Sequence, residues 1–170
     1  MKLFCIITLS IISMSAYSQD LLSFEDPNFL ISYPKNWTLD NSKSSGTEFM
    51  IFSPLLDEED FYQDFFKMNV MPLPGQNETL EHFSDQHVKD ISFFYQDAKF
   101  NVDEYIEHGG KRCRHIQFSG AFNGFGLTQE QYIWLFFDQA YILTYTAESV
   151  DYWKLREKSK EVFKTFRFKY

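Results

Sequence analysis

Two neighbouring segments, residues 132–137 and 141–146, carry apolar side chains at nearly every position instead of every second one. A strand that alternates polar and apolar residues is covered on one face, whereas a strand that is apolar throughout has both faces buried. Only a few residues around Asp138 and Gln139 separate the two segments, which predicts an antiparallel pair. Further layers are therefore expected above and below this pair of strands.

Three shorter strands are predicted earlier in the chain, at residues 29–33, 48–52 and 66–71. Each is rich in aromatic and aliphatic residues, and a proline follows each within two positions, which is typical of a strand end. Residues 55–65, between the second and third strands, mix acidic and aromatic residues. They predict a loop that leaves the sheet.

A first helix is predicted after Asn77 or Thr79, either of which can cap its start. Its apolar stripe recurs at spacings of three and four residues and consists of Leu80, Phe83, His87, Ile91 and Phe94. Ser149 is the predicted cap of a second helix near the end of the chain. The expected buried side of that helix consists of Val150, Trp153, Val162, Phe163 and Phe166.

Residues 98–121 predict a β-hairpin around two adjacent glycines. A two-residue turn made by these glycines would pair Ile106 with Cys113 and mix polar and apolar groups on both faces. A three-residue loop, residues 109–111, separates the two kinds of group and is therefore the predicted turn. The polar face of the hairpin then includes Tyr105, Glu107, Cys113 and His115.

These elements predict an α+β fold in which an antiparallel β-sheet is sandwiched by helices, in α/β/α layers. Phe, Tyr and Trp make up 19% of the residues. Aromatic side chains bury large areas and suit a layered core. Lining a ligand cavity is the alternative use for some of them.

The first eighteen residues predict an export signal. A basic residue follows the initial Met, residues 3–14 are apolar but too few to span a bilayer, and small residues stand at Ala16 and Ser18. This layout is typical of a signal peptide (residues 1–18) that is cleaved after Ser18. It leaves residues 19–170 as one domain in the periplasm or outside the cell, with no later segment long enough for a membrane helix.

Cleavage at that point leaves Cys113 as the only cysteine, so no disulfide can form within the mature chain. A buried, unreactive thiol is the favoured interpretation, because free cysteine behaves as a small apolar residue. The formal net charge of the full chain is −8. This disfavours nucleic acid and anionic membranes as partners, since both bind clustered Lys and Arg.

Three stretches carry a family resemblance. The sequence Phe-Leu-Ile-Ser-Tyr-Pro-Lys-Asn-Trp opens the domain at residues 29–37, Ile-Leu-Thr-Tyr-Thr-Ala stands at 142–147, and Phe-Lys-Thr-Phe-Arg-Phe ends the last helix at 163–168. In content and order they resemble the PsbP-like superfamily, which includes PsbP of photosystem II, DcrB-type envelope proteins and Mog-type Ran-binding proteins. The resemblance implies a helix-covered antiparallel sheet and a binding or assembly role. It transfers no functional residue.

Two candidate binding sites for a partner or ligand emerge. Phe61, Tyr62 and Phe65 follow the acidic run 57–60 and predict a partner-binding loop. The run offers oxygen ligands for calcium as an alternative, but it lacks the spacing and the central glycine of an EF-hand loop. Tyr105 and His115 predict the second binding site, on the polar face of the hairpin.

Catalytic and metal signals are weak. Cys113 and His115 could form a redox or metal-binding spot, and Glu78 and His82 could share a metal, but two ligands make a weak site. No nucleophile elbow, phosphate-binding loop, zinc-protease motif or dinucleotide fingerprint is present in the sequence. We therefore expect no catalytic residues, no metal site and no cofactor.

The leading hypothesis is an exported, non-enzymatic binding or accessory protein of the cell envelope. Its partner would be an unidentified envelope protein or a small ligand. One alternative is an envelope-acting hydrolase that uses Glu104, His115 or Cys113. Another is an immunity or inhibitor protein that binds a secreted toxin through its acidic face.

Overall fold

The computed structural model describes residues 20–43 and 46–170. The predicted signal peptide and its cleavage site lie outside the described residues. Ten strands and two helices are formed in the described part of the chain. In order they are β1 (Leu21–Glu25), β2 (Phe29–Pro34), β3 (Thr38–Asp40), β4 (Phe49–Phe52), β5 (Phe65–Pro72), α1 (Leu80–Phe94), β6 (Gln96–His108), β7 (Lys111–Phe122), β8 (Phe125–Phe136), β9 (Gln139–Glu148), α2 (Tyr152–Thr165) and β10 (Arg167–Phe168).

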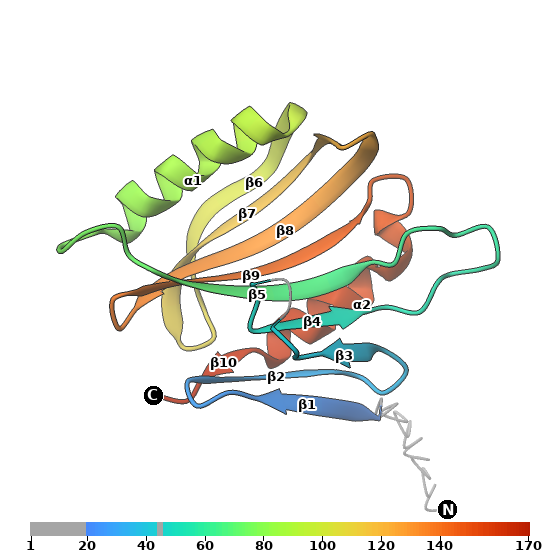
Figure 1. Cartoon of the computed structure of the whole chain (residues 1–170), viewed down its shortest axis with the longest axis horizontal. Helices are drawn as coiled ribbons and strands as arrows, with labels where there is room; N and C mark the ends of the chain where they lie inside the picture. The colour runs from blue at the N-terminus through green and yellow to red at the C-terminus, as the bar shows by residue number, and fades with distance from the viewer. Residues whose placement is uncertain (1–19, 44–45) are drawn as a thin grey trace, which may run out of the picture.

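Seven of the strands form one antiparallel sheet in the order β3-β4-β5-β9-β8-β7-β6, and the other three form a small sheet in the order β1-β2-β10. Helix α1 covers one face of the large sheet over β6, β7 and β8, while α2 packs against β9 and β2 on the other face (Figure 1). The predicted α+β class, with an antiparallel sheet between helices, is confirmed. No helix of the described residues is long and apolar enough to cross a membrane.

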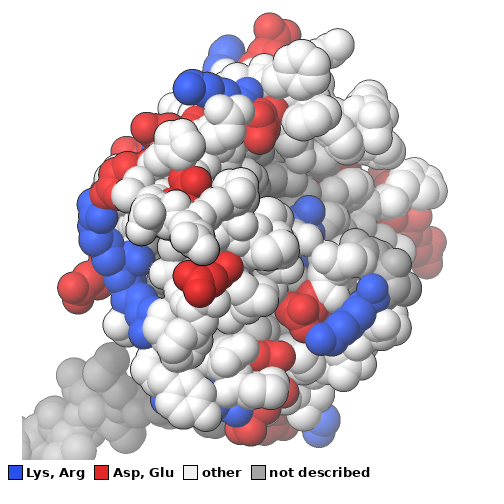
Figure 2. Space-filling view, turned by 60° about the vertical axis from the view of Figure 1, so that its left-hand side comes forward, with Lys and Arg blue, Asp and Glu red and all other residues white. Residues whose placement is uncertain are grey.

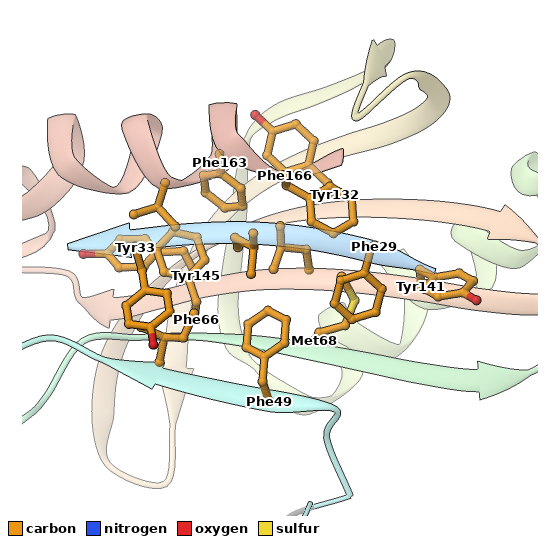
Figure 3. Close-up of a cluster of buried hydrophobic side chains, with 14 of the residues drawn as sticks. Phe29, Tyr33, Phe49, Phe66, Met68, Tyr132, Tyr141, Tyr145, Phe163 and Phe166 are labelled. Atoms are coloured by element: carbon orange, nitrogen blue, oxygen red, sulfur yellow. The ribbon is translucent and has the colours of Figure 1, made fainter. Parts of the chain in front are cut away.

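Strands β8 and β9 are buried on both faces, as their continuous apolar pattern predicted. Tyr132 and Trp134 of β8 face α2, whereas Ile133 between them faces α1. The face toward α2 holds most of the core, which is mainly aromatic (Figure 3). Within it, the ring of Phe66 lies 4.8 Å from Phe163 and 4.9 Å from Tyr145, between ring centroids. Each such buried ring contributes on the order of 2–3 kcal/mol to folding.

Strand β2 is the centre of the small sheet and joins the two ends of the described chain. Its partner on one edge is β1, and on the other edge Phe168 of β10 pairs with Phe29. The Thr165 hydroxyl, at the end of α2, accepts from the Ser32 N–H at 2.8 Å and lies 2.9 Å from the Ser32 carbonyl. The last residues of the chain therefore complete a sheet that the first strands begin.

The turn between β6 and β7 differs from the predicted three-residue loop. His108 pairs with Lys111, so the turn has two residues, both glycines, with φ of 61° and 83°. Positive φ at both positions is what a type I′ turn requires, and glycine adopts it without steric cost. The register is corrected further along β6, where a bulge between Phe100 and Val102 lets Phe100 pair with Phe118. The extra residue that keeps the apolar faces together therefore lies in the strand and not in the turn.

The predicted cap of α1 is confirmed, whereas the predicted cap of α2 is wrong. Thr79 caps α1, as predicted, because its hydroxyl accepts from the His82 N–H at 3.1 Å. Ser149 does not cap α2. Its hydroxyl lies 3.0 Å from the Thr128 hydroxyl, and the helix begins after Asp151.

This later start changes which side chains α2 buries. Val150 and Trp153, predicted to be buried, are 74% and 70% exposed. Leu155 and Ser159 face the core instead, with the correctly predicted Val162 and Phe163. On α1, Phe94 is also exposed against prediction, because it is the last residue of that helix.

Candidate functional site

Exposed aromatic side chains gather at one end of the large sheet. The antiparallel pairings bring the starts of β5, β6 and β8 and the ends of β7 and β9 to this end, with the end of α1 and the start of α2 beside them (Figure 1). We use the name aromatic rim for six exposed aromatic residues here together with the half-buried Tyr62, which contacts one of them. They are Phe61, Tyr62, Phe93, Phe94, Phe122, Phe125 and Trp153.

A ring contact and a hydrogen bond link several of these segments. The Tyr62 ring lies 5.7 Å from that of Phe125, which joins the β4–β5 loop to the β7–β8 turn. A surface depression of about 460 Å³ lies between the end of α1, at Phe94, and the same turn, at Phe122. The start of α2 is tied in because the Ser149 N–H donates to the carbonyl of Gly126 at 2.8 Å.

The β4–β5 loop is folded by its own carboxylates. Asp60 accepts from the N–H groups of Leu56 at 2.7 Å and Tyr62 at 3.0 Å, and Asp57 accepts from the N–H of Glu59 at 2.9 Å. Asp57 and Asp60, two of the predicted alternative calcium ligands, therefore accept hydrogen bonds from the backbone of their own loop. No group of three or more His, Cys, Asp or Glu side chains in the described residues is placed to hold a metal ion.

Asp64 anchors the base of this loop. It is buried, and the Tyr145 hydroxyl donates to its carboxylate at 2.6 Å. Its backbone carbonyl accepts from the N–H of Ser53 at 2.8 Å, which closes the loop. Burial raises the pKa of Asp64 to about 6, an effect that the hydrogen bond from Tyr145 opposes but does not cancel.

The three predicted loop residues lie close together but differ in exposure. Phe61 is 92% exposed, whereas Tyr62 and Phe65 are half-buried and lie 6.4 Å apart between ring centroids. Their role in binding stays a prediction. The other aromatic residues of the rim were not predicted to belong to this site. In an antiparallel sheet, the start of each strand lies beside the end of its neighbour. This rule could have placed the residues before β6, between β7 and β8 and after β9 at the same end of the sheet.

The other two predicted site residues do not share a face. Tyr105 pairs with Arg114 and lies on the α1 side of the sheet, while His115 pairs with Glu104 and lies on the α2 side. The predicted register, which put them together, is wrong because the turn has two residues. A single binding spot formed by Tyr105 and His115 is therefore not present in the structure.

His115 sits between two carboxylates. Its Nε2 lies 3.0 Å from Glu130 and its Nδ1 lies 3.3 Å from Glu104, and its ring stacks on Tyr132 at 4.4 Å. Burial alone would lower the pKa of His115, but hydrogen bonds and charge attraction from Glu130 and Glu104 outweigh it and raise the pKa. Both ring nitrogens are therefore engaged by acids, which favours the charged imidazolium.

Cys113 is fully buried, as predicted, with its thiol 3.6 Å from the Ile106 carbonyl. Burial raises the pKa of this thiol to about 12, so the thiolate is not populated near neutral pH. A thiol of this kind is a poor nucleophile and a poor metal ligand. The arrangement of Cys113 and His115 therefore offers packing and polar pairing, not an activated nucleophile.

On the α1 side, Arg114 is the centre of a polar network that was not predicted from the sequence. Its guanidinium donates to Asp103 at 2.6 and 2.8 Å and to Asp85 of α1 at 2.5 Å, and hydrogen bonds to these acids raise its pKa. The bonds tie α1 to the sheet. His87 is a satisfied core histidine, as expected, with Nε2 2.8 Å from the Gln131 side-chain oxygen.

Comparison with known proteins identifies the fold. No family model matches the sequence, and no curated protein is similar to it in sequence. Solved structures do match. The cyanobacterial PsbP protein CyanoP of Synechocystis sp. PCC 6803 has a TM-score of 0.59 and 12% identity, over 91% of this chain and 95% of that one.

Two further structures are similar over most of their lengths. LpqN, described as involved in cell envelope biogenesis of Mycobacterium tuberculosis, has a TM-score of 0.60 and 13% identity, over 88% of this chain and 91% of its own. The Saccharomyces cerevisiae Ran-binding protein Mog1p has a TM-score of 0.59 and 10% identity, over 88% and 96%. The chain therefore has the PsbP-like fold, as its sequence predicted.

Proposed function

We propose that this protein is an exported, non-enzymatic binding protein whose aromatic rim docks a protein partner. The observation that carries the proposal is the collection of seven aromatic side chains, from segments far apart in sequence, at one end of the sheet. Exposed apolar surface that gathers in one place marks interaction sites. Phe, Tyr and Trp are also enriched in the centres of protein interfaces.

Charges beside the aromatic rim define the chemistry of the partner. The acidic run 57–60 leads into it, and the exposed Asp90 and Asp97 lie near the end of α1. A partner that presents apolar side chains flanked by Lys or Arg would fit both features. An anionic membrane surface would be repelled by the same acids. Binding should weaken as salt is added, because the charges involved are exposed to solvent.

The proposed location is the cell envelope. The N-terminal sequence favours export, and LpqN, which has the same fold, is described as involved in envelope biogenesis. Mog1p, another protein with this fold, is described as Ran-binding, so the fold can serve protein recognition. The domain would then act after removal of residues 1–18.

The test is site-specific photo-crosslinking in intact cells of the host. A photoreactive phenylalanine at position 61 is compared with one at position 137, which is equally aromatic and 65% exposed but lies at the opposite end of the sheet. We expect a discrete crosslinked partner from position 61 only. Adding Phe125→Ala and Trp153→Ala should reduce its yield about tenfold or more.

The same experiment can overturn the proposal. Equal crosslinking from positions 61 and 137, or an unchanged yield in the Phe125→Ala, Trp153→Ala protein, would show that the aromatic rim does not dock the partner. Circular dichroism of the variant provides the control for folding. Both substituted side chains are exposed, so their loss should leave the fold intact.

A further inference from the structure

The α1 side of the sheet carries a row of polar side chains where α1 does not cover it. Helix α1 packs over β6, β7 and β8, while β9 and β5 continue the sheet beyond it. Lys67 of β5 pairs with Thr144 of β9, which pairs with Gln131 of β8. Directly paired residues in an antiparallel sheet point to the same face, with their Cβ atoms roughly 5 Å apart. Lys67 and Thr144 are therefore neighbours on this face.

Two hydroxyls in this row have no hydrogen-bond partner. Thr144 and Thr146 are each 1% exposed, and their Oγ1 atoms have no partner within the described part of the chain. Thr146 follows Thr144 by two residues, so both point to the α1 side. Burying a hydroxyl without a partner costs folding free energy, and native structures seldom do so twice at adjacent positions of one strand face.

Lys67 is also without a partner. It is half-buried and makes no hydrogen bond or ion pair within residues 20–43 and 46–170. Burial lowers its pKa, and the charged or titratable group that faces it is His87, which it repels. A charged group is rarely buried unless an opposite charge compensates it. Here the compensating charge is missing from the part of the protein that the structure describes.

A groove lies beside this row of side chains. It has a volume of about 200 Å³, lies between α1 and the end of β5, and has His87, Glu78 and Asp90 in its wall, with His87 on the side nearest the row. His87 contacts Gln131, the strand neighbour of Thr144. Figure 2 shows the molecule hollowed on one side, with basic atoms inside the hollow. The groove is below the usual size of a drug-sized site, so a ligand would have few heavy atoms.

We propose that Lys67, Thr144 and Thr146 form a binding site for a small organic carboxylate. The ammonium of Lys67 would pair with the carboxylate, and the two hydroxyls would donate to its oxygens. A single lysine matches one negative charge. Phosphate, with more charge, is usually held by arginine forks or by several backbone N–H groups, whereas Arg114 on this side of the sheet is already bonded to Asp85 and Asp103. The proposal does not depend on the aromatic rim.

The test is a titration of the isotope-labelled mature protein with sodium benzoate, followed by NMR, with sodium phosphate in a parallel titration. Benzoate should give saturable shifts at Lys67, Thr144 and Thr146. Lys67→Met should weaken benzoate binding at least tenfold, and Thr144→Val should weaken it several-fold. The matched control is Lys89→Met, which removes an exposed lysine from the outer side of α1 and should leave binding unchanged.

Three outcomes of these titrations bear on the proposed carboxylate site. Absence of saturation by benzoate, or equal binding by the Lys67→Met protein, would overturn the site. Tighter binding of phosphate than of benzoate would overturn its carboxylate chemistry. Loss of folding is not expected to confuse the result, because both substitutions remove a polar group that has no partner. Near-ultraviolet circular dichroism checks this for each variant.

Discussion

The two sides of the large sheet are built differently. The side toward α2 holds twenty buried residues, most of them large apolar or aromatic, whereas the buried apolar cluster on the α1 side has five. Threonine, glutamine, arginine and lysine fill much of the remaining α1 side. Among the described residues, Thr144, Thr146 and Lys67 on the α1 side have no hydrogen-bond partner, and on the α2 side the same holds for the indole N–H of Trp37. The α2 side supplies stability, which leaves the α1 side free to keep groups that do not help folding.

The largest expected effect tests whether stability comes from the α2 side. Phe66→Ala should lower the free energy of unfolding by about 3–5 kcal/mol, because it leaves a cavity among fully buried rings. Phe83→Ala, on the half-buried α1 side, should cost about 1–2 kcal/mol. Urea denaturation of both variants measures the difference. Equal losses would mean that the two sides stabilise the fold equally.

A second prediction concerns Asp64, a carboxylate on the α2 side whose ionisation is disfavoured by burial. Burial raises the pKa of Asp64 to about 6, from its ordinary value of 3.8, so the folded state holds this proton more tightly than the unfolded state. This stabilises the protonated protein, and the advantage is lost as the pH rises from about 4 through 6. Asp64→Asn cannot titrate. Relative to the natural protein, it should therefore gain on the order of 2–3 kcal/mol between pH 4 and pH 7.5.

Denaturation at the two pH values measures this gain. Glu58→Gln, which removes an exposed carboxylate from the same loop, controls for the change in net charge. A constant difference between the Asp64→Asn and natural proteins across this range would show that Asp64 does not change protonation on unfolding there. Burial on the α2 side would then not raise the pKa of Asp64.

The smallest effect compares two buried threonines on opposite sides of the sheet. Thr144→Val should raise the free energy of unfolding by about 1 kcal/mol, because its hydroxyl is buried without a partner. Thr128→Val should lower it by about 1 kcal/mol, because the Thr128 hydroxyl bonds those of Ser119 at 2.8 Å and Ser149 at 3.0 Å. Thermal denaturation can resolve the opposite signs. A loss in both variants would show that the Thr144 hydroxyl has a partner in solution.

The sequence predicted those parts of the fold that depend on local pattern. The double burial of β8 and β9 follows from residues 132–137 and 141–146, and the start of α1 follows from the cap at Thr79. The short strands β1, β3 and β10 were not predicted. Two of them have only two or three residues, and such strands form because a partner strand is already in place.

The candidate site could be predicted only in part, for a similar reason. Phe61 and Tyr62 are visible as an aromatic pair after an acidic run. Phe125 and Trp153 join them only when strand order and direction are known, since they lie far away in sequence. The separation of Tyr105 from His115 follows from the two-residue turn, while the extra residue that lets Phe100 pair with Phe118 lies in a bulge further along β6. Pattern alone does not fix where a strand accommodates an extra residue.

The position of β2 between β1 and β10 has a consequence for how the chain is made. Residues 29 and 168, which pair in the small sheet, are among the first and last parts of the domain to be synthesised. One edge of β2 therefore stays open until residues 167–168 have been synthesised, and contacts this distant in sequence also form slowly. For the exported protein proposed above, this delay would keep the chain unfolded while it is threaded through a translocation channel. Folding would then finish on the far side, when the C-terminal strand arrives.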